Sequence, residues 1–189
     1  MKSLEKFDEN DRRIVSLLMK KPDMSQTAIA SHLKLSQPAV YSRIRRLRNS
    51  GILTRVVGVN LAETNLHMVK VEITAKEPWK IVDFFDKCPM FVNGFIISGR
   101  HNLCLFFVSE KLQAIECCIN HNLRKNPNVL DTESNVVVTP VKDFVVPITI
   151  YSEKHEKAPC GKRCVEQSCY PDGKCLGCPA TVFYKGKLL

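Results

Sequence analysis

The sequence lacks any long hydrophobic run. No segment approaches the roughly 20 uncharged apolar residues that a membrane-spanning helix requires, and the first residues hold no apolar stretch of signal-peptide length. We therefore expect a cytoplasmic protein with no membrane partner. Because thiols stay reduced in that compartment, the nine cysteines of the chain favour metal binding or redox chemistry over structural disulfides.

The sequence signatures of enzymes are also missing. There are no paired carboxylates, no glycine-rich phosphate loop and no Cys–His nucleophile arrangement. Internal repeats and low-complexity tracts are absent as well. The sequence thus predicts a protein that is not an enzyme.

Acidic residues are absent between Met24 and Leu61, and this gap coincides with an excess of basic ones. The net charge of +9 is concentrated in residues 1–60, where twelve Lys and Arg face five Asp and Glu, a balance of +7. The net charge is −1 in residues 61–150 and +3 in residues 151–189. A concentrated positive field suits a polyanionic partner, because basic side chains that neutralise phosphates release condensed counterions.

Three short amphipathic helices are predicted in the basic region. Asp8 is placed to cap the first helix, Ser25 the second and Ser36 the third. Pro38 falls in the first turn of the third helix, where a missing N–H costs little, and Gly51 follows its end. The pattern is typical of a helix-turn-helix whose last helix enters the major groove of double-stranded DNA.

The outward face of that last helix carries the candidate DNA contacts. Side chains at its start and middle are predicted to read base edges, and most of its arginines are predicted to pair with phosphates. No acid between residues 24 and 61 is available to neutralise these arginines. We predict base or groove contacts for Gln37, Tyr41, Ser42 and Arg45, phosphate contacts for Arg43, Arg46 and Arg48, and further DNA-binding positions at Thr27, Ser36 and Pro38.

The middle of the chain predicts an α+β domain. Apolar periodicity indicates strands at 67–74, 91–98, 103–109 and 129–139, a helix at 78–87, a second helix from a Ser109 cap to about 123, and a further strand within 144–151. The order strand, helix, strand, strand, helix, strand fits a ferredoxin-like (βαββαβ) sandwich. We therefore predict a helix-turn-helix domain at 1–60, a linker at 61–66, the sandwich at 67–151 and a small metal-stabilised tail at 152–189.

The first two domains together resemble the leucine-responsive regulator/AsnC family of transcription factors over roughly residues 7–148. The resemblance is carried by Phe7-Asp8-Glu9-Asn10-Asp11-Arg12-Arg13-Ile14, Ala30-Ser31-His32-Leu33-Lys34-Leu35-Ser36, Val40-Tyr41-Ser42-Arg43-Ile44-Arg45-Arg46-Leu47, Gly51-Ile52-Leu53 and Gly99-Arg100-His101-Asn102-Leu103. It implies a sequence-specific DNA-binding regulator that assembles as a homodimer or as an octamer of dimers.

The resemblance also marks Gly99, Arg100, His101 and Asn102 as a candidate effector loop. In the family this loop commonly ends in an aspartate and helps to form an amino-acid pocket, whereas Asn102 stands at that place here. The absence of a carboxylate that would hold an ammonium group disfavours an amino-acid effector. A role for Gly99 in the turn itself is the favoured interpretation.

Five cysteines close to the end of the sequence form the second candidate site. Cys160, Cys164, Cys169, Cys175 and Cys178 follow the spacing C-x3-C-x4-C-x5-C-x2-C, with His155 upstream. The glycines and prolines between them supply turns, and no hydrophobic core is apparent in 155–180. We therefore expect a thiophilic ion, Zn(II) or Cu(I), to supply the folding free energy.

The C-x2-C pair of the tail is similar to the opening of the TRASH-type metal-sensing domain found on archaeal regulators, although its usual later cysteines are missing. A metal sensor, a structural zinc knot, a redox switch and an iron–sulfur cluster all remain compatible with this spacing. Cys88, Cys104, Cys117 and Cys118 lie in apolar surroundings and are expected to be small core residues.

These observations predict a metal-responsive regulator of the leucine-responsive/AsnC type. The alternatives are a DNA-compacting architectural protein whose zinc knot is purely structural, and a redox-responsive regulator. Footprinting separates the first alternative, because an architectural protein coats DNA uniformly instead of protecting a few promoters.

Overall fold

The structure is a computed structural model that describes residues 7–189. The chain divides into two compact units after Val56, and the first six residues of the predicted 1–60 domain lie outside the described part. No helix among the described residues is both long and apolar enough to cross a bilayer.

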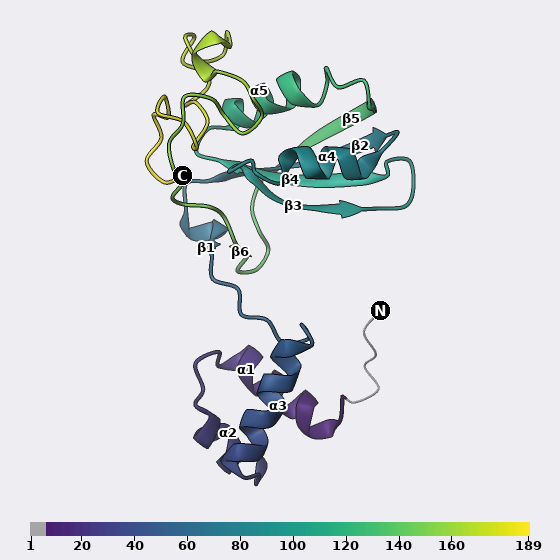
Figure 1. The fold of residues 1–189 in the computed structure, drawn as a ribbon, viewed down its shortest axis with the longest axis vertical. Coiled ribbons are helices and arrows are strands. Elements are labelled where there is room, and N and C mark those ends of the chain that lie inside the picture. The colour runs from purple at the N-terminus through teal and green to yellow at the C-terminus, as the bar shows by residue number, and fades with distance from the viewer. Residues whose placement is uncertain (1–6) are drawn as a thin grey trace. The chain divides into compact units, whose positions relative to one another are not determined.

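The N-terminal unit contains three helices, α1 (Glu9–Lys20), α2 (Gln26–Leu33) and α3 (Gln37–Asn49) (Figure 1). Asp8, Ser25 and Ser36 accept backbone N–H bonds at the three helix starts, as the sequence predicts. The turn between α2 and α3 places Lys34 in the left-handed region at φ 53°. Apolar side chains from all three helices close a small core, which includes Ile14, Ile29, Ala30, Val40 and Ile44.

The second unit is built on a four-stranded antiparallel sheet in the order β3-β4-β2-β5. Its strands are β2 (His67–Ala75), β3 (Phe91–Ile96), β4 (Leu103–Ser109) and β5 (Val129–Val137), and its helices are α4 (Pro78–Phe85) and α5 (Leu112–Asn122). Both helices cover one face of the sheet (Figure 1). This order and layering confirm the predicted ferredoxin-like sandwich.

The main core lies between the sheet and the two helices. Alternate residues of β2 point to the helices, and Phe85 and Phe107 pack edge to face with ring centroids 5.0 Å apart. The predicted Ser109 cap is wrong: α5 begins at Leu112, and Ser109 instead accepts the N–H of Lys111 at 3.4 Å. The hydroxyl is too far upstream to reach the first turn of the helix.

The predicted linker at 61–66 is part of the sandwich unit. Val59–Asn60 (β1) pairs with Val145–Val146 (β6), a short 3-10 turn spans Leu61–Glu63 (η1), and both Leu61 and Leu66 are buried. Gly58 allows this ribbon to form, because a Cβ there would lie 2.3 Å from the carbonyl oxygen of Val146. The strand predicted within 144–151 shortens to these two residues of β6.

The cysteine-rich tail, residues 152–189, folds against the sandwich as part of the same unit. It is largely irregular, with one 3-10 turn at Cys164–Glu166 (η2) and a parallel bridge between His155 and Thr181. The expectation that the tail has no core is wrong in part, because Ala158, Cys178 and Ala180 form a small buried cluster. Leu189 is buried in a second cluster with Met68, Val108 and Val146 of the sandwich.

Candidate functional site

The first candidate site is the outward face of α3. Ser36 accepts the N–H of Ala39 at 3.4 Å and so satisfies one of the unpaired N–H groups of the first turn, while Val40, Ile44 and Leu47 face the core. The remaining side chains are displayed outward because only about three residues in every two turns are used for packing. The predicted contacts at Thr27, Ser36, Gln37, Pro38, Tyr41, Ser42, Arg45, Arg46 and Arg48 are all exposed.

Two arginines of α3 are held by α1. Oδ1 of Asp11 accepts from Nη1 of Arg43 at 2.9 Å, and Oδ2 of Asp11 accepts from Nη2 of Arg46. Oδ2 of Asp8 accepts from the same Nη1 of Arg43 at 2.6 Å. These bonds raise the pKa of Arg43, and the bond from Arg43 holds the pKa of Asp8 below its usual range. The two carboxylates therefore tie α3 to α1.

This arrangement corrects the sequence argument about neutralising acids. Asp11 has no exposed surface and closes a reciprocal capping box with Asp8, whose N–H it accepts at 3.1 Å. Asp11 lies more than 30 residues before Arg43, outside the acid-free segment 24–61, and only the packing of α1 against α3 brings it to the arginines. Arg43 and Arg46 thus have a structural role in addition to any phosphate contact.

Arg45 and Arg48 differ from that pair. Among the described residues they form no ion pair, and they flank a shallow hollow with Tyr41 at the exposed side of α3. Gln37 lies at the helix start and donates from Nε2 to Oε1 of Gln26 at 3.1 Å, which orients the two amides together. The positive and polar groups available to an external polyanion are therefore centred on Arg45 and Arg48.

The loop at 99–102 is fastened to strand β2. Asn102 accepts the N–H of Ala75 at 2.9 Å and donates to the carbonyl oxygen of Ala75 at 2.7 Å, and Gly99 takes φ 122°. His101 is buried and its Nδ1 lies 3.1 Å from the hydroxyl of Thr74. Both side-chain polar groups of Asn102 are thus occupied by Ala75 of β2, which accords with a structural role for this loop.

The second candidate site is a cavity of about 80 Å³ in the sandwich unit. The five tail cysteines that the sequence singles out all line it: Cys160, Cys164, Cys169, Cys175 and Cys178. Three cysteines expected to be core residues line it too, namely Cys88, Cys117 and Cys118. Cys104, buried in β4, is the one cysteine of the chain that does not. His155 is exposed and borders a different groove.

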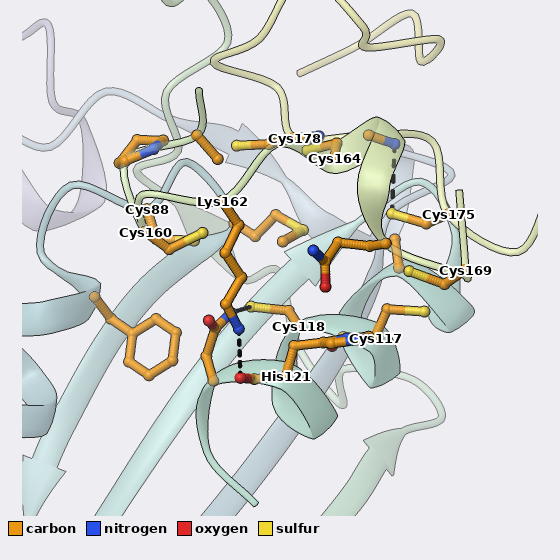
Figure 2. Close-up of a pocket in the computed structure, with 18 of the residues that line it drawn as sticks. Cys88, Cys117, Cys118, His121, Cys160, Lys162, Cys164, Cys169, Cys175 and Cys178 are labelled. Atoms are coloured by element: carbon orange, nitrogen blue, oxygen red, sulfur yellow. Dashed lines mark hydrogen bonds between the residues drawn. The ribbon is translucent and has the colours of Figure 1, made fainter. Parts of the chain in front are cut away.

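Figure 2 shows how the eight thiols are arranged. Cys117 and Cys118 project from α5, and Cys88 follows the end of α4, whereas the other five come from the tail. The periodicity of α5 does not predict this arrangement, since a cysteine beside Ile115 and Ile119 has the spacing of a core residue. The adjacency of Cys117 and Cys118 was the available signal, because one of two consecutive helix positions must turn away from the core centre.

Lysine contacts hold the tail along α5. Nζ of Lys111, before the helix, donates to the carbonyl oxygen of Gly173 at 3.0 Å. Nζ of Lys162 donates to the carbonyl oxygen of His121 at 2.5 Å, at the negative end of the helix dipole. The tail therefore follows the helix from end to end, and this path brings its cysteines to Cys117 and Cys118.

Burial keeps most of these thiols protonated at neutral pH. Desolvation raises the pKa of Cys169 to about 11, of Cys175 to about 11 and of Cys178 to about 12. The pKa values of Cys160 and Cys117 are also raised, chiefly by burial. Cys88 is the exception: the side-chain hydrogen bond with Cys118 lowers its pKa and raises that of Cys118. Thiols that are mainly neutral react slowly with oxidants.

The donor chemistry of the cavity fits a thiophilic ion. Thiolate sulfur is the ligand that Cu(I) and Zn(II) take in preference to oxygen, and apolar neighbours such as Phe85 and Met90 exclude competing water. Among residues 7–189, however, no three His, Cys, Asp or Glu side chains already converge in a metal-binding arrangement. An ion would therefore have to draw the thiols together by rotamer changes.

Comparison with known proteins identifies the two folded parts. A family described as winged helix-turn-helix DNA-binding matches residues 7–54. The chain is 21% identical over 150 residues to the transcriptional regulator AzlB of Bacillus subtilis, covering 75% of this chain and 96% of that protein. It is 26% identical over 151 residues to an uncharacterised HTH-type transcriptional regulator of Pyrococcus abyssi, covering 73% of this chain and 89% of that protein.

Solved structures agree on the fold. AsnC of E. coli superposes with a TM-score of 0.60 at 15% identity, over 74% of this chain and 97% of that one. LrpC of B. subtilis gives a TM-score of 0.61 at 24% identity, over 71% of this chain and 96% of that one. Each match leaves uncovered a part of this chain that is large enough to hold the tail.

The N-terminal unit is therefore a helix-turn-helix DNA-binding domain, joined to an α+β domain with the fold of AsnC and LrpC. The curated relatives are transcriptional regulators, which are not enzymes.

Proposed function

We propose that this protein is a sequence-specific DNA-binding transcriptional regulator of the leucine-responsive/AsnC type, whose DNA affinity responds to a thiophilic metal ion bound by its tail. The observation that carries the DNA-binding part is the exposed face of α3. Arg45 and Arg48 are displayed there without a carboxylate partner among the described residues, beside Tyr41. Two curated relatives that are regulators and span three quarters of the chain support the same assignment.

In this proposal α3 lies in the major groove, and its arginines differ in the part of the DNA or of the protein that they contact. Arg45 is placed to reach base edges, where a bidentate contact contributes about 1–3 kcal/mol of discrimination. Arg48, near the helix end, is placed to pair with a phosphate, which carries no sequence information. Arg43 and Arg46 keep α1 and α3 in register through Asp11.

The test is binding of the full chain to DNA fragments that the wild-type protein selects from a random pool. We expect Arg45→Ala to weaken binding to the selected sequence about 5- to 150-fold. Arg48→Ala should weaken all sequences similarly and reduce the slope of log affinity against log salt by about 0.9. Arg13→Ala is the control, because Arg13 is paired with Glu9 on the exposed side of α1. Wild-type affinity in both α3 variants would refute the assignment of the recognition face.

Metal responsiveness is the finer part of the proposal. The donors are Cys160, Cys164, Cys169, Cys175 and Cys178, and the ion is Cu(I) or Zn(II). When bound, such an ion cross-links the segments that carry its ligands and stabilises that folded form. Leu189 of the tail is buried in one cluster with Leu61 and Val146. This cluster adjoins the β1–β6 pair, which follows the helix-turn-helix unit in sequence.

Operator binding with and without Cu(I) or Zn(II) tests this part. A coupling of about 1–3 kcal/mol corresponds to a 5- to 150-fold change in operator affinity. Equal affinity in all conditions, despite measured metal uptake, would leave the ion a structural role and remove the response. Footprinting then distinguishes a regulator, which protects a few sites, from an architectural protein, which coats DNA evenly.

Self-association through the sandwich is part of the same proposal, as a homodimer or an octamer of dimers. The sheet presents exposed apolar side chains at its edges, including Phe95, Ile96, Leu130 and Val136. Exposed apolar side chains on edge strands are suited to contact with another chain. Light scattering of the full chain measures the assembly, and a monomer at micromolar concentration would contradict it.

A further inference from the structure

We infer that the metal site is composite: Cys88, Cys117 and Cys118 of the sandwich supply ligands together with the tail cysteines, and the site binds more than one thiophilic ion per chain. This inference rests on the metal-binding part of the proposed function and extends it. In a composite site, metal binding cross-links the tail to α5. In a site made by the tail cysteines alone, it would join only segments of the tail.

The first observation is a group of thiols contributed by both parts of the chain. Cys169 of the tail lines the cavity together with Cys117 of α5 and with Cys175 of the tail. Figure 2 shows these three side chains on the same side of the cavity. A ligand that reaches Cys169 therefore meets the α5 thiol as readily as the next tail thiol.

A second group lies on the other side of the same cavity. Cys88 and Cys118 of the sandwich line it together with Cys160 of the tail, and Figure 2 shows these three on the side away from Cys169 and Cys175. Within the tail, the sulfur of Cys164 accepts the N–H of Cys178 at 3.2 Å. Both groups thus combine sandwich and tail residues, which a site confined to the tail would not require.

The cavity volume restricts what the thiols can hold. A water-sized occupant needs about 10–15 Å³ by the same measure, so a cavity of about 80 Å³ holds only a few small particles. Single ions fit this space, and thiolate sulfur selects thiophilic ones.

The number of donors exceeds what one ion uses. A tetrahedral zinc site takes four protein ligands, whereas eight cysteines line this cavity. Two ions with four thiolate ligands each, drawn from both the sandwich and the tail, would account for all eight cysteines. Each thiol that becomes a ligand releases one proton to solvent and forms one sulfur–metal bond, so no oxidant or reductant is needed.

The contrast with Cys104 separates ligands from packing residues. Cys104 lies in β4, is 7% exposed, and has no part in the cavity. It is the matched control, because it is a buried cysteine of the same unit that does not line the cavity.

The experiment loads the full chain with Zn(II) or with Cu(I), removes unbound metal and measures the metal-to-protein ratio by elemental analysis. We expect more than one ion per wild-type chain, a loss of at least one ion in Cys117→Ser/Cys118→Ser, and no loss in Cys104→Ser. Cys175→Ser/Cys178→Ser should also lose metal. If only this last variant loses metal, the tail site stands and the composite site is refuted. If the wild-type chain binds none, the metal part of the proposed function fails with it.

A second measurement needs no substitution and so avoids any folding defect of the variants. Mass spectrometry compares the alkylation rate of each cysteine in the wild-type chain with and without metal. Protection of Cys88, Cys117 and Cys118 together with the tail cysteines supports the composite site, with Cys104 as the unaffected reference. Protection of tail cysteines alone would overturn it.

Discussion

The hydroxyl of Tyr184 donates to Oε1 of Glu110 at 2.6 Å, across 74 residues of sequence. The same carboxylate accepts the N–H groups of Lys187 and Leu188, each at 2.8 Å. Glu110 precedes α5, so this cluster of bonds, here called the latch, fastens the last residues of the described chain to the sandwich. The latch and the two lysine contacts along α5 hold the tail where its cysteines face Cys117 and Cys118.

Removing the Glu110 carboxylate should open the latch. A hydrogen bond to a charged group contributes about 1.5–3 kcal/mol. Because the liberated N–H groups can bond to water instead, we expect Glu110→Ala to lower the free energy of releasing the tail end by about 2 kcal/mol. Hydrogen exchange at residues 184–189 should accelerate about 30-fold as a result. Glu116→Ala is the control, since Glu116 is a half-exposed carboxylate of α5 that pairs with Arg124. Equal exchange in both variants would contradict the role of the latch.

The latch should also depend on pH in a defined window. Burial alone would raise the pKa of Glu110, but the bonds from Tyr184 and from the backbone hold it below the ordinary 4.5. The stabilisation from Glu110 is therefore complete above pH 4.5 and is lost as the pH falls through the lower folded pKa. Burial and the Glu110 bond raise the pKa of Tyr184 above the ordinary 10.0, so its contribution is complete below pH 10.0 and is lost only at higher pH.

Methyl NMR signals of Leu188 and Leu189 measure this window. We expect their native positions to persist from near-neutral to mildly acidic pH and to shift toward free-chain values only below pH 4.5. In Glu110→Gln, which keeps an acceptor oxygen without the charge, the acid transition should disappear. A wild-type spectrum that is unchanged down to pH 2 would show that the carboxylate does not hold the tail.

Asp11 should matter more for the stability of the helix-turn-helix than its position on α1 suggests. Asp11→Ala removes a fully buried carboxylate, leaves Arg43 and Arg46 without it, and breaks the capping box. Because both arginines keep some access to water, we expect a loss of about 2 kcal/mol and not the larger cost of a fully buried unpaired charge. Hydrogen exchange in α1 and α3 measures this loss.

Asp23→Ala provides the comparison for Asp11→Ala. Asp23 also pairs with an arginine, Arg55 at 2.6 Å, but its side chain is 83% exposed. An exposed pair contributes little, so exchange in the helices should stay close to wild type. If the two variants behave alike, the buried carboxylate does not organise the domain.

Gly177 is a position where the tail tolerates little change. It adopts φ 86°, and a Cβ there would lie 2.8 Å from the carbonyl oxygen of Phe183. Gly177→Ala should therefore destabilise the docked tail by about 1–3 kcal/mol and reduce its metal uptake. Gly173→Ala is the matched control, because Gly173 has a similar φ of 69° but open space around it. A tail that remains docked in Gly177→Ala, judged by hydrogen exchange, would contradict this prediction.

The sequence by itself determined the local elements and their order. The caps at Asp8, Ser25 and Ser36 act within one turn of the chain, so reading neighbouring residues suffices to place the three helices. The strand and helix periodicities of residues 67–137 likewise reflect which side of each element is buried, and they predict the sandwich. The basic character of the third helix is also a property of sequence alone.

Only the tertiary structure decided which distant groups meet. Asp11 bonds to Arg43 and Arg46, and Cys117 lines the same cavity as Cys169, because packing brings together side chains that no local period connects. A cysteine on an apolar helix has the same pattern whether it contacts other core residues or a row of thiols. The difference lies in the path of the tail, which depends on Glu110, Lys111 and Lys162, three side chains whose carbonyl, amide and hydroxyl partners are invisible until the chain has folded.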